Sequence, residues 1–381
     1  MPSLYIHFPF CLRKCSYCAF YSDTHCAEIP LFLECLQKEM RLRADELSGV
    51  PADSLYFGGG TPSLLAPADI GKLIVLADEI FGLSPDAEIT LEANPNQLTD
   101  EYFRGLRDTP VNRLSVGVQS FSDEVLRRIR RLHTSVQAEQ ALALAKKHGF
   151  HNISADLIYG LPGSTLEQLE SDLRRLSQLP HLSCYQLTLE EGSILELQLR
   201  KGLERLPSED GTEAQRKLVW EYLRDAGFTH YEVSSFCRGE AWSRHNTAYW
   251  RQQPYLGFGP AAHSYLPHRR QWNLPDVRGY CRCVSDLSDG KGWDDLEGLV
   301  FEREQLTPEM EYEEYLMTGL RTCWGCSLEH IVKRWGEGRK AHIMRQLGSC
   351  PKHYYRLVDN QLVLTEAGLL FADGIAADLF V

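Results

Sequence analysis

Three cysteines near the start of the chain have types and spacing that suit metal chemistry. Cys11, Cys15 and Cys18 form the pattern Cys-x3-Cys-x2-Cys in the segment CLRKCSYC, and a triplet this tight rarely arises by chance. Thiolates gathered in one loop suit a cubane iron–sulfur cluster, in which each iron takes one thiolate. Three thiolates leave the fourth iron open, and an open coordination position binds something exchangeable.

Two other interpretations of the cysteines stay open. A structural zinc ion would need a fourth protein ligand, which His7, His25 or Cys26 could supply. Free cysteines also occur as small buried apolar residues, and this fits the scattered ones better than metal or redox use. We interpret two further pairs as buried thiols, namely Cys281 with Cys283 and the C-x-x-C pair Cys323 with Cys326.

Glycines and polar side chains follow the other strand-like segments. The run Gly58-Gly59-Gly60-Thr61-Pro62 would let backbone groups approach a ligand closely, although such a run alone can also be a turn. Single polar residues at later strand ends could be surface or capping residues, or could line one site. These candidates are Glu92, Gln119, Asp156 and, as a weaker choice, Thr188, with Arg131 on the helix after Gln119.

Alternating strands and helices must position these residues. Short apolar or β-branched runs bounded by Gly, Pro or Asn predict strands at 3–8, 53–57, 88–92, 113–118, 152–159 and 183–189. Helices are expected at 30–47, 67–81 and 136–148, with Thr99, Ser122 and Ser135 as caps and two overlapping capping boxes in 164–168. Six such repeats imply a parallel sheet with right-handed crossovers, and their short span suits an incomplete (β/α)6 barrel. In such barrels the chemistry lies at the carboxyl ends of the strands, where every motif above falls.

The rest of the chain divides into two further parts. We expect a partial barrel at 1–235, ending with a helix at 212–226 and a strand at 229–235, then an aromatic-rich segment at 236–290. Residues 291–381 form a small, mostly helical C-terminal domain. It resembles a winged helix, with helices at 309–321, 327–336, 339–347 and 365–379 and a hairpin turning at Asp359-Asn360.

Composition limits the partners. The net charge is −12, so nucleic-acid binding is not expected, and the basic run at 127–131 is better explained as a solvated helix face with Arg131 turned inward. No stretch approaches the roughly 20 apolar residues of a membrane span. The N-terminal segment MPSLYIHFPF lacks a basic region typical of a secretory signal, so we expect a cytoplasmic protein.

The cysteine segment at the end of the first strand resembles the cluster motif of the radical S-adenosylmethionine (SAM) superfamily. The resemblance implies a 4Fe-4S cluster whose open iron is chelated by SAM, and a low-potential electron donor that reduces the cluster so that SAM is cleaved to a radical. It also implies that Tyr17 lies beside the adenine and that backbone groups of Gly59, Gly60 and Thr61 meet the SAM amino group. The ribose, carboxylate and adenosyl hydroxyls are then assigned to Glu92, Gln119, Arg131 and Asp156, with Thr188 as the weaker choice.

Further motifs indicate which group within the superfamily the chain resembles. This resemblance covers roughly residues 3–265. Tyr5, six residues before Cys11 in LYIHFPFC, together with GGGTPS, GVQSF, LHT and DLIYGLPG, resembles oxygen-independent coproporphyrinogen III oxidase and its relatives. The true oxidases carry a fourth cysteine two residues after the third, where this chain has Phe20, and an N-terminal extension that this sequence does not show. The segment HNTAYW at 245–250, followed by YLGFGPAAHSY, instead resembles the heme chaperone subgroup, HemW.

This subgroup implies a heme site. A neutral imidazole is a common ligand of heme iron, so His245 is the candidate ligand and Asn246 could hold it by a hydrogen bond. Tyr249 and Trp250 offer flat faces for a macrocycle. A structural histidine in an aromatic loop is the alternative, and His263 is a second, weaker heme-ligand candidate.

The sequence therefore predicts a heme chaperone that binds heme and delivers it to an unknown acceptor protein, and that carries the cluster and SAM. A coproporphyrinogen III oxidase and a heme storage or sensor protein with a vestigial cluster are the alternatives. A homodimer is possible, and we expect the C-terminal domain to pack over the barrel mouth and to exclude water and oxygen there.

Overall fold

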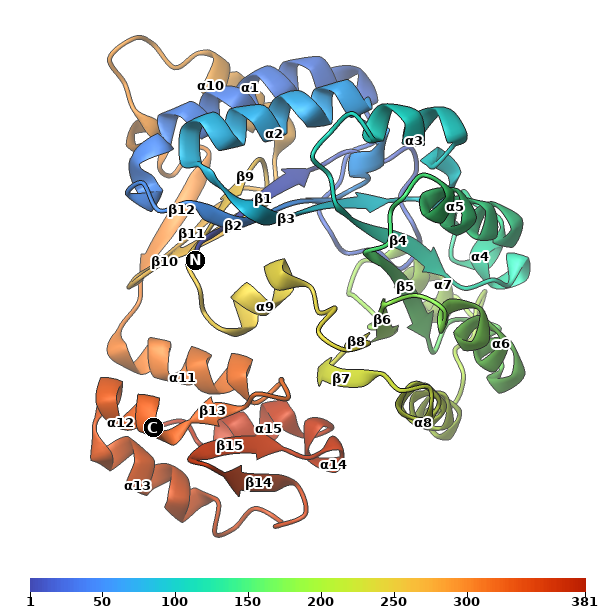
Figure 1. Ribbon diagram of the computed structural model, residues 1–381, viewed down its shortest axis with the longest axis vertical. Helices are drawn as coiled ribbons and strands as arrows, with labels where there is room; N and C mark the ends of the chain where they lie inside the picture. The colour runs from blue at the N-terminus through green and yellow to red at the C-terminus, as the bar shows by residue number, and fades with distance from the viewer.

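A twelve-stranded mixed sheet forms the larger part of the computed structural model, which describes residues 1–381 (Figure 1). The strand order is β12-β11-β10-β9-β1-β2-β3-β4-β5-β6-β8-β7, so the six expected parallel strands occupy its centre. Their bounds are β1 Ser3–Phe8, β2 Ala52–Gly59, β3 Leu83–Ala93, β4 Arg113–Gln119, β5 Ile153–Tyr159 and β6 His181–Gln186. The edge strands β12 and β7 do not pair, which confirms an α/β fold with an incomplete barrel.

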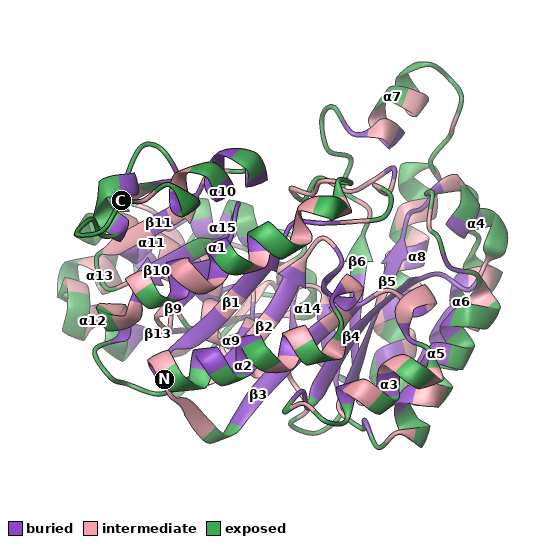
Figure 2. Ribbon diagram, turned by 90° about the horizontal axis from the view of Figure 1, so that it is seen from above, coloured by how far each residue is buried: buried purple, intermediate pink, exposed green.

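The two faces of the central strands differ in chemistry because successive side chains alternate. In β1, Leu4, Ile6 and Phe8 are fully buried in the main core, to which helices on the outer face contribute (Figures 1 and 2). These helices are α1 Ile29–Leu42, α2 Pro67–Phe81, α3 Asp100–Leu106, α5 Ser135–Lys147, α6 Leu166–Leu176 and α8 Glu209–Asp225. The opposite, inner face carries polar or aromatic residues at the alternating positions, such as Ser54 and Tyr56 of β2.

Local signals placed several elements correctly and missed others. Thr99 and Ser122 cap α3 and α4 (Asp123–Arg128) as expected. Thr134 rather than Ser135 caps α5, because Thr134 and Gln137 together form the capping box. In the segment 164–168 only Thr165 caps the helix that follows, α6.

Two other expected elements differ from the structure. The helix expected at 30–47 ends at Leu42, and a separate 3-10 turn spans Ala44–Leu47. The strand expected at 229–235 is a hairpin, because the chain reverses at 233–234 between β7 (Thr229–Glu232) and β8 (Ser235–Cys237).

The segment after β8 continues the sheet on the other side of β1. A short helix, α9 (Arg244–Trp250), contains the HNxxYW motif, and β9 (Tyr255–Phe258) then pairs with β1 in parallel. The remaining elements are β10 His263–Leu266, β11 Arg269–Asn273, α10 Val277–Ser285 and β12 Phe301–Gln305. The division of the chain at 235 and 290 remains a prediction, whereas the sheet itself runs on to Gln305.

Residues from Pro308 onward have a hydrophobic core of their own, which includes Tyr312, Leu316, Ile331 and Leu362. The hairpin turns at Asp359-Asn360 as predicted, and both residues have positive φ. The elements are α11 Pro308–Gly319, β13 Cys326–Ser327, α12 Leu328–Trp335, α13 Glu337–Gln346, β14 Tyr355–Val358, β15 Gln361–Leu364, α14 Glu366–Leu369 and α15 Ala372–Asp378. The expected last helix is thus split in two. No helix of the chain is long and apolar enough to cross a membrane.

Candidate functional site

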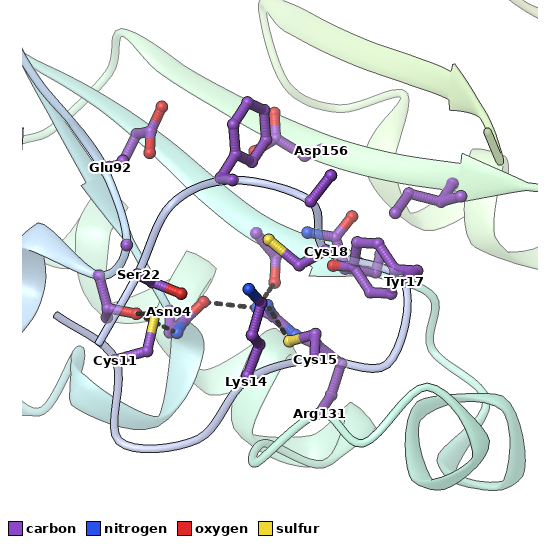
Figure 3. Close-up of a pocket in the computed structure, with 18 of the residues that line it drawn as sticks. Cys11, Lys14, Cys15, Tyr17, Cys18, Ser22, Glu92, Asn94, Arg131 and Asp156 are labelled. Atoms are coloured by element: carbon purple, nitrogen blue, oxygen red, sulfur yellow. Dashed lines mark hydrogen bonds between the residues drawn. The ribbon is translucent and has the colours of Figure 1, made fainter. Parts of the chain in front are cut away.

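A cavity of about 430 Å³ opens at the carboxyl ends of the central strands, within the range of roughly 300–1,000 Å³ that is typical of ligand sites (Figure 3). It brings together residues that are up to 179 positions apart, from Cys11 to Glu190. The predicted site residues that line it are Cys11, Cys15, Tyr17, Cys18, Gly59, Gly60, Thr61, Glu92, Gln119, Arg131, Asp156 and Thr188. Tyr5, His245, Asn246, Tyr249 and Trp250 do not line it.

The three cysteines lie on the loop that leaves β1, and this loop is fixed at several points. The backbone N–H of Cys11 donates to Asp23 O at 2.9 Å, and that of Ser16 donates to Ile129 O at 3.1 Å. Thr61 Oγ1 donates to Cys11 Sγ at 3.4 Å. All three thiols are free, and burial raises the pKa of Cys11 and Cys18.

The donor set fits a cubane better than a zinc ion. No group of three or more His, Cys, Asp or Glu side chains is arranged to hold a single metal ion. Neither ring nitrogen of His7 is available, since Nδ1 is 3.1 Å from Tyr5 Oη and Nε2 is 3.1 Å from Tyr21 O. His25 and Cys26 do not line the cavity either. Three thiols without a fourth side-chain ligand match a cluster in which each thiolate binds a separate iron.

Arg131 joins the cysteine loop to β3 and β4. Its Nη2 donates to Asn94 Oδ1 at 2.5 Å and to Gly117 O at 2.6 Å, while Nη1 is 3.5 Å from Cys15 Sγ (Figure 3). Asn94 Nδ2 in turn donates to Thr61 Oγ1 at 3.1 Å. The expected position of Arg131 on a helix is wrong, because α4 ends at Arg128 and a residue with positive φ follows before Arg131.

Asn94 was missed from the sequence, although it follows β3 directly and obeys the same strand-end rule as Glu92. Two buried polar atoms in this wall have no partner in the protein, namely Arg131 Nε and Gln119 Oε1. Buried groups of this kind need a hydrogen-bond partner, and a ligand with a carboxylate and an amino group can provide one.

Gln119 is aimed into the cavity by an irregularity in β4. The register with β5 shifts between Gly117 and Gln119, and Gln119 has a φ of 67°. β-Bulges and left-handed residues that are not glycine occur often beside functional sites, since both redirect a side chain.

Two carboxylates form the acidic wall of the cavity. Tyr56 Oη donates to Glu92 Oε1 at 2.8 Å, and Ser115 Oγ donates to Asp156 Oδ1 at 3.3 Å. Burial raises the pKa of Glu92 to about 7 and that of Asp156 to about 6. Both side chains retain free acceptor capacity, which suits a ligand that offers hydroxyl groups. Tyr56 was not predicted, because nothing in the sequence shows that its ring reaches across to β3.

Thr188 lies just beyond its strand, because β6 ends at Gln186 and not at 189 as expected. Tyr17 packs against an apolar cluster that includes Val125, Ile129 and Ile158. A flat ring on an apolar support suits a heteroaromatic ligand. Phe20, at the position of the oxidases' fourth cysteine, also lines the cavity and is 70% exposed.

Two of the glycines after β2 have no room for a side chain. A Cβ on Gly60 would lie 2.5 Å from Phe10 O, and Gly59 has a φ of 105° with the His7 ring 2.7 Å from its Cβ position. The glycine run therefore lets β2 lie directly against the segment that leads into Cys11.

The HNxxYW motif lies elsewhere, on the inner face near the amino ends of β2 and β3. His245 is 1% exposed; its Nδ1 is 2.8 Å from Ser54 Oγ and its Nε2 is 2.7 Å from Tyr249 Oη. Burial lowers the pKa of His245 to about 3, so the imidazole is neutral. Glu88 accepts hydrogen bonds from the backbone N–H groups of Arg244 and His245, which fixes the start of α9.

The other candidates remain apart from the cavity. His263 is exposed and its ring stacks on Trp272. Cys281 and Cys326 are buried as expected and Cys283 is half-buried, but Cys323 is exposed because it lies in the turn after α11.

The expectation that the C-terminal domain covers the mouth is wrong. None of the residues that line the cavity follows Glu190, and α11 packs against α9 instead. The segment that reaches the cysteine loop is α7 (Ile194–Arg200), where Leu195 N donates to Ser16 O at 2.8 Å; in Figure 2, α7 projects from the body of the protein.

Comparison with known proteins agrees with this geometry. The family model of the radical SAM superfamily matches residues 5–176. A protein of Lactococcus lactis named Heme chaperone HemW is 36% identical over 337 residues, 87% of this chain and 85% of that protein. Its counterpart in Bacillus subtilis is 31% identical over 98% of both chains. A Danio rerio protein named radical S-adenosyl methionine domain-containing protein 1, mitochondrial, is 38% identical over 98% of this chain and 85% of that protein.

Among solved structures, the coproporphyrinogen III oxidase HemN of Escherichia coli superposes with a TM-score of 0.84 and 24% identity, over 100% of this chain and 90% of that one. This likeness shows the fold. Since the HemW relatives are more than 30% identical over nearly the whole chain, the protein belongs to the radical SAM superfamily and, within it, to the HemW family.

Proposed function

We propose that the protein is a heme chaperone, which binds heme and passes it to an acceptor protein while it carries a 4Fe-4S cluster and SAM. The observation that supports this most directly is the near full-length similarity to proteins named Heme chaperone HemW. A cytoplasmic location, a low-potential electron donor and a homodimer remain predictions from the sequence.

The residues of the cavity suggest how SAM would be held. Cys11, Cys15 and Cys18 would bind three irons of the cluster, and the bound cluster with SAM would supply one-electron chemistry. The unpaired atoms of Gln119 and Arg131 suit the charged end of SAM. The remaining contacts follow the chemistry of each wall: Glu92 and Asp156 for the ribose hydroxyls, Tyr17 and Thr188 for the adenosyl group, and the backbone of Gly59, Gly60 and Thr61 for the amino group.

Heme is assigned to α9, with His245 as the iron ligand. Tyr249 and Trp250 would contact the macrocycle, and Asn246 would support the ligand. Because Nε2 of His245 is hydrogen-bonded to Tyr249 and the ring is buried, iron binding requires the imidazole to leave this hydrogen bond and become exposed.

The test is a hemin titration of the anaerobically reconstituted protein, followed by the Soret band. We expect His245→Ala to shift the Soret band or lower the heme stoichiometry, and the exposed His263→Ala to leave both unchanged. Identical spectra and stoichiometry for His245→Ala would remove His245 from the ligands. Transfer is measured by adding an apo-hemoprotein, and failure of the wild type to load it would refute the chaperone function.

Oxidation of coproporphyrinogen III is the second candidate, because the oxidase HemN has the same fold. Against it stands Phe20, which occupies the position of a cysteine that the oxidases carry. Anaerobic incubation of the reduced protein with coproporphyrinogen III and SAM should give no decarboxylated product. If Cys11, Cys15 and Cys18 can all be changed to serine without loss of heme transfer, the cluster is vestigial.

A further inference from the structure

Three stacked rings connect the HNxxYW helix with the cavity. The rings of Tyr56 and His245 are 4.8 Å apart with an interplanar angle of 25°. Tyr5 stacks on both, at 6.1 Å from Tyr56 and 6.2 Å from His245. The close approach of the two tyrosines also explains Gly58, whose Cβ would lie 2.8 Å from the Tyr5 ring and 3.0 Å from the Tyr56 ring. We call Tyr5, Tyr56 and His245 the aromatic column.

The end of the column nearer the cavity makes two hydrogen bonds. Tyr56 Oη donates to Glu92 in the cavity wall at 2.8 Å. Tyr5 Oη is 3.1 Å from His7 Nδ1, and the same imidazole contacts Tyr21 O, just beyond the cysteine loop. The column therefore contacts the acidic wall directly and is linked through His7 to the backbone just beyond the cysteine loop.

The opposite end of the column is fixed to α9 and to the strands β2 and β3, which also carry Tyr56 and Glu92. His245 is held by Ser54 of β2, two residues before Tyr56. The backbone of α9 is held by Glu88 of β3, four residues before Glu92 on the same face and roughly 13 Å along the strand. A movement of His245 thus acts on a side chain that is in direct contact with the cavity wall.

We propose that Tyr56 is a positioning residue that couples the two sites, so that heme at His245 and SAM at Glu92 weaken each other's binding. With His245 packed in the column, Tyr56 is held where it orients Glu92 toward a SAM hydroxyl. When the imidazole turns out to bind iron, the ring support of Tyr56 is lost. The inference rests on the proposed function, and linkage requires the effect to be equal in both directions.

The first experiment needs no heme. SAM dissociation constants are measured by equilibrium dialysis for the cluster-loaded wild type, Tyr56→Phe, His245→Gln and the double variant. We expect Tyr56→Phe to weaken SAM binding about tenfold, the effect of losing a hydrogen bond to a charged group. His245→Gln alone should weaken SAM binding about fivefold. Added to Tyr56→Phe, the same substitution should weaken SAM binding by less than about twofold further.

If the effects of Tyr56→Phe and His245→Gln on the free energy of SAM binding are additive in this double-mutant cycle, the coupling is overturned. Ser54→Ala, which removes the partner of His245 Nδ1 together with a hydrogen bond to Ser3, replaces His245→Gln if that variant does not fold. The matched control is Tyr102→Phe, because the Tyr102 hydroxyl is buried without a partner, does not line the cavity, and should not affect SAM affinity.

The pH profile separates positioning from a merely structural role. Tyr56 lowers the pKa of Glu92, whereas burial and Asp156 raise it. Glu92 is also faced by Tyr5, Tyr185 and Tyr249, whose own pKa values burial raises. Loss of the Tyr56 hydroxyl should therefore move the pH below which SAM affinity falls to a higher value. A uniform loss of affinity at all pH values would contradict the proposal.

The second experiment adds hemin. Saturating hemin should weaken SAM binding at least about fivefold in the wild type, and SAM should weaken hemin binding by the same factor. In Tyr56→Phe both factors should fall below about two. Equal SAM affinity with and without bound hemin in the wild type would overturn the coupling. Failure of hemin to bind would instead refute the proposed function, while the heme-free cycle would still decide whether positions 56 and 245 are coupled.

Discussion

The Glu92 carboxylate is a polar group whose position in the cavity wall has a stability cost. Its ordinary pKa of 4.5 rises to about 7 in the folded chain, chiefly because burial disfavours the charge. A group whose pKa is raised on folding contributes stability that is fully present below pH 4.5 and is lost as the pH rises through 7.

Glu92→Gln should therefore stabilise the SAM-free protein at high pH and bind SAM poorly. The amide still accepts the hydrogen bond from Tyr56, so packing is kept. We expect no difference from the wild type at about pH 4, and a gain of at most about 3 kcal/mol at about pH 8, since the cavity is partly open to solvent. Denaturant unfolding at both pH values measures this difference in the free energy of unfolding, and the substitution of an exposed residue, Glu101→Gln, is the control. Equal stability at the higher pH would contradict the assigned charge.

At this scale the sequence predicted the residues that lie at strand ends. Cys11, Glu92 and Asp156 follow the rule that parallel strands bring their carboxyl ends together, and all three line the cavity. Asn94 also follows a strand and was missed, whereas Tyr56 was not predicted because its role depends on Glu92 across the sheet. The environment of His245 could not be predicted either, since its burial depends on Ser54, which is 191 residues away.

The glycine turn after β2 supports the cysteine loop through direct backbone contact. A methyl group on Gly60 would meet a main-chain oxygen, Phe10 O at 2.5 Å, and neither backbone can yield without moving Cys11. By contrast, a methyl group on Gly71 in α2 meets only Thr109 at an ordinary 3.5 Å.

Gly60→Ala should therefore lower the iron and sulfide bound per chain after anaerobic reconstitution. Gly71→Ala should leave both unchanged and stabilise the protein by up to about 1 kcal/mol, the helix-propensity difference. Full iron loading in Gly60→Ala would show that the loop can shift without losing the site.

Elements with strong local signals were predictable, and elements defined by tertiary pairing were not. β1 and α2 have the predicted bounds because Pro67 and the apolar runs mark them locally. The strands β9 to β12 are only four or five residues long and gain stability from pairing with β1 and with one another. Such strands leave too short a pattern to detect.

The whole molecule contains two large hydrophobic cores, and ion pairs are among the contacts between them. Arg270 Nη2 pairs with Glu314 of α11 at 2.8 Å, and His268 pairs with Glu311 at 2.9 Å. Ion pairs of this kind contribute about 1 kcal/mol or less each. These weak ion pairs hold α11, which also packs against α9, to the hairpin of β10 and β11.

Combined Glu311→Gln and Glu314→Gln should loosen this junction. We expect amide hydrogen exchange in α9 to become about fivefold faster, which corresponds to about 1 kcal/mol, while β4 and β5 exchange as before. Hydrogen exchange with mass spectrometry gives both values for one sample. Unchanged exchange in α9 would show that Glu88 and Ser54 alone determine its stability.

The position of β1 between β2 and β9 has a consequence for biosynthesis. One edge of β1 is complete once Gly59 has been made, but the other waits for Tyr255–Phe258, roughly 200 residues later. At roughly 5–20 residues per second, synthesis of this stretch takes on the order of 10–40 s, and the second edge of β1 is unpaired during that time. The cysteines that follow β1 are therefore exposed to oxygen and to stray metal ions before their support is finished. Insertion of the proposed cluster after release from the ribosome would meet a loop whose supporting sheet is complete.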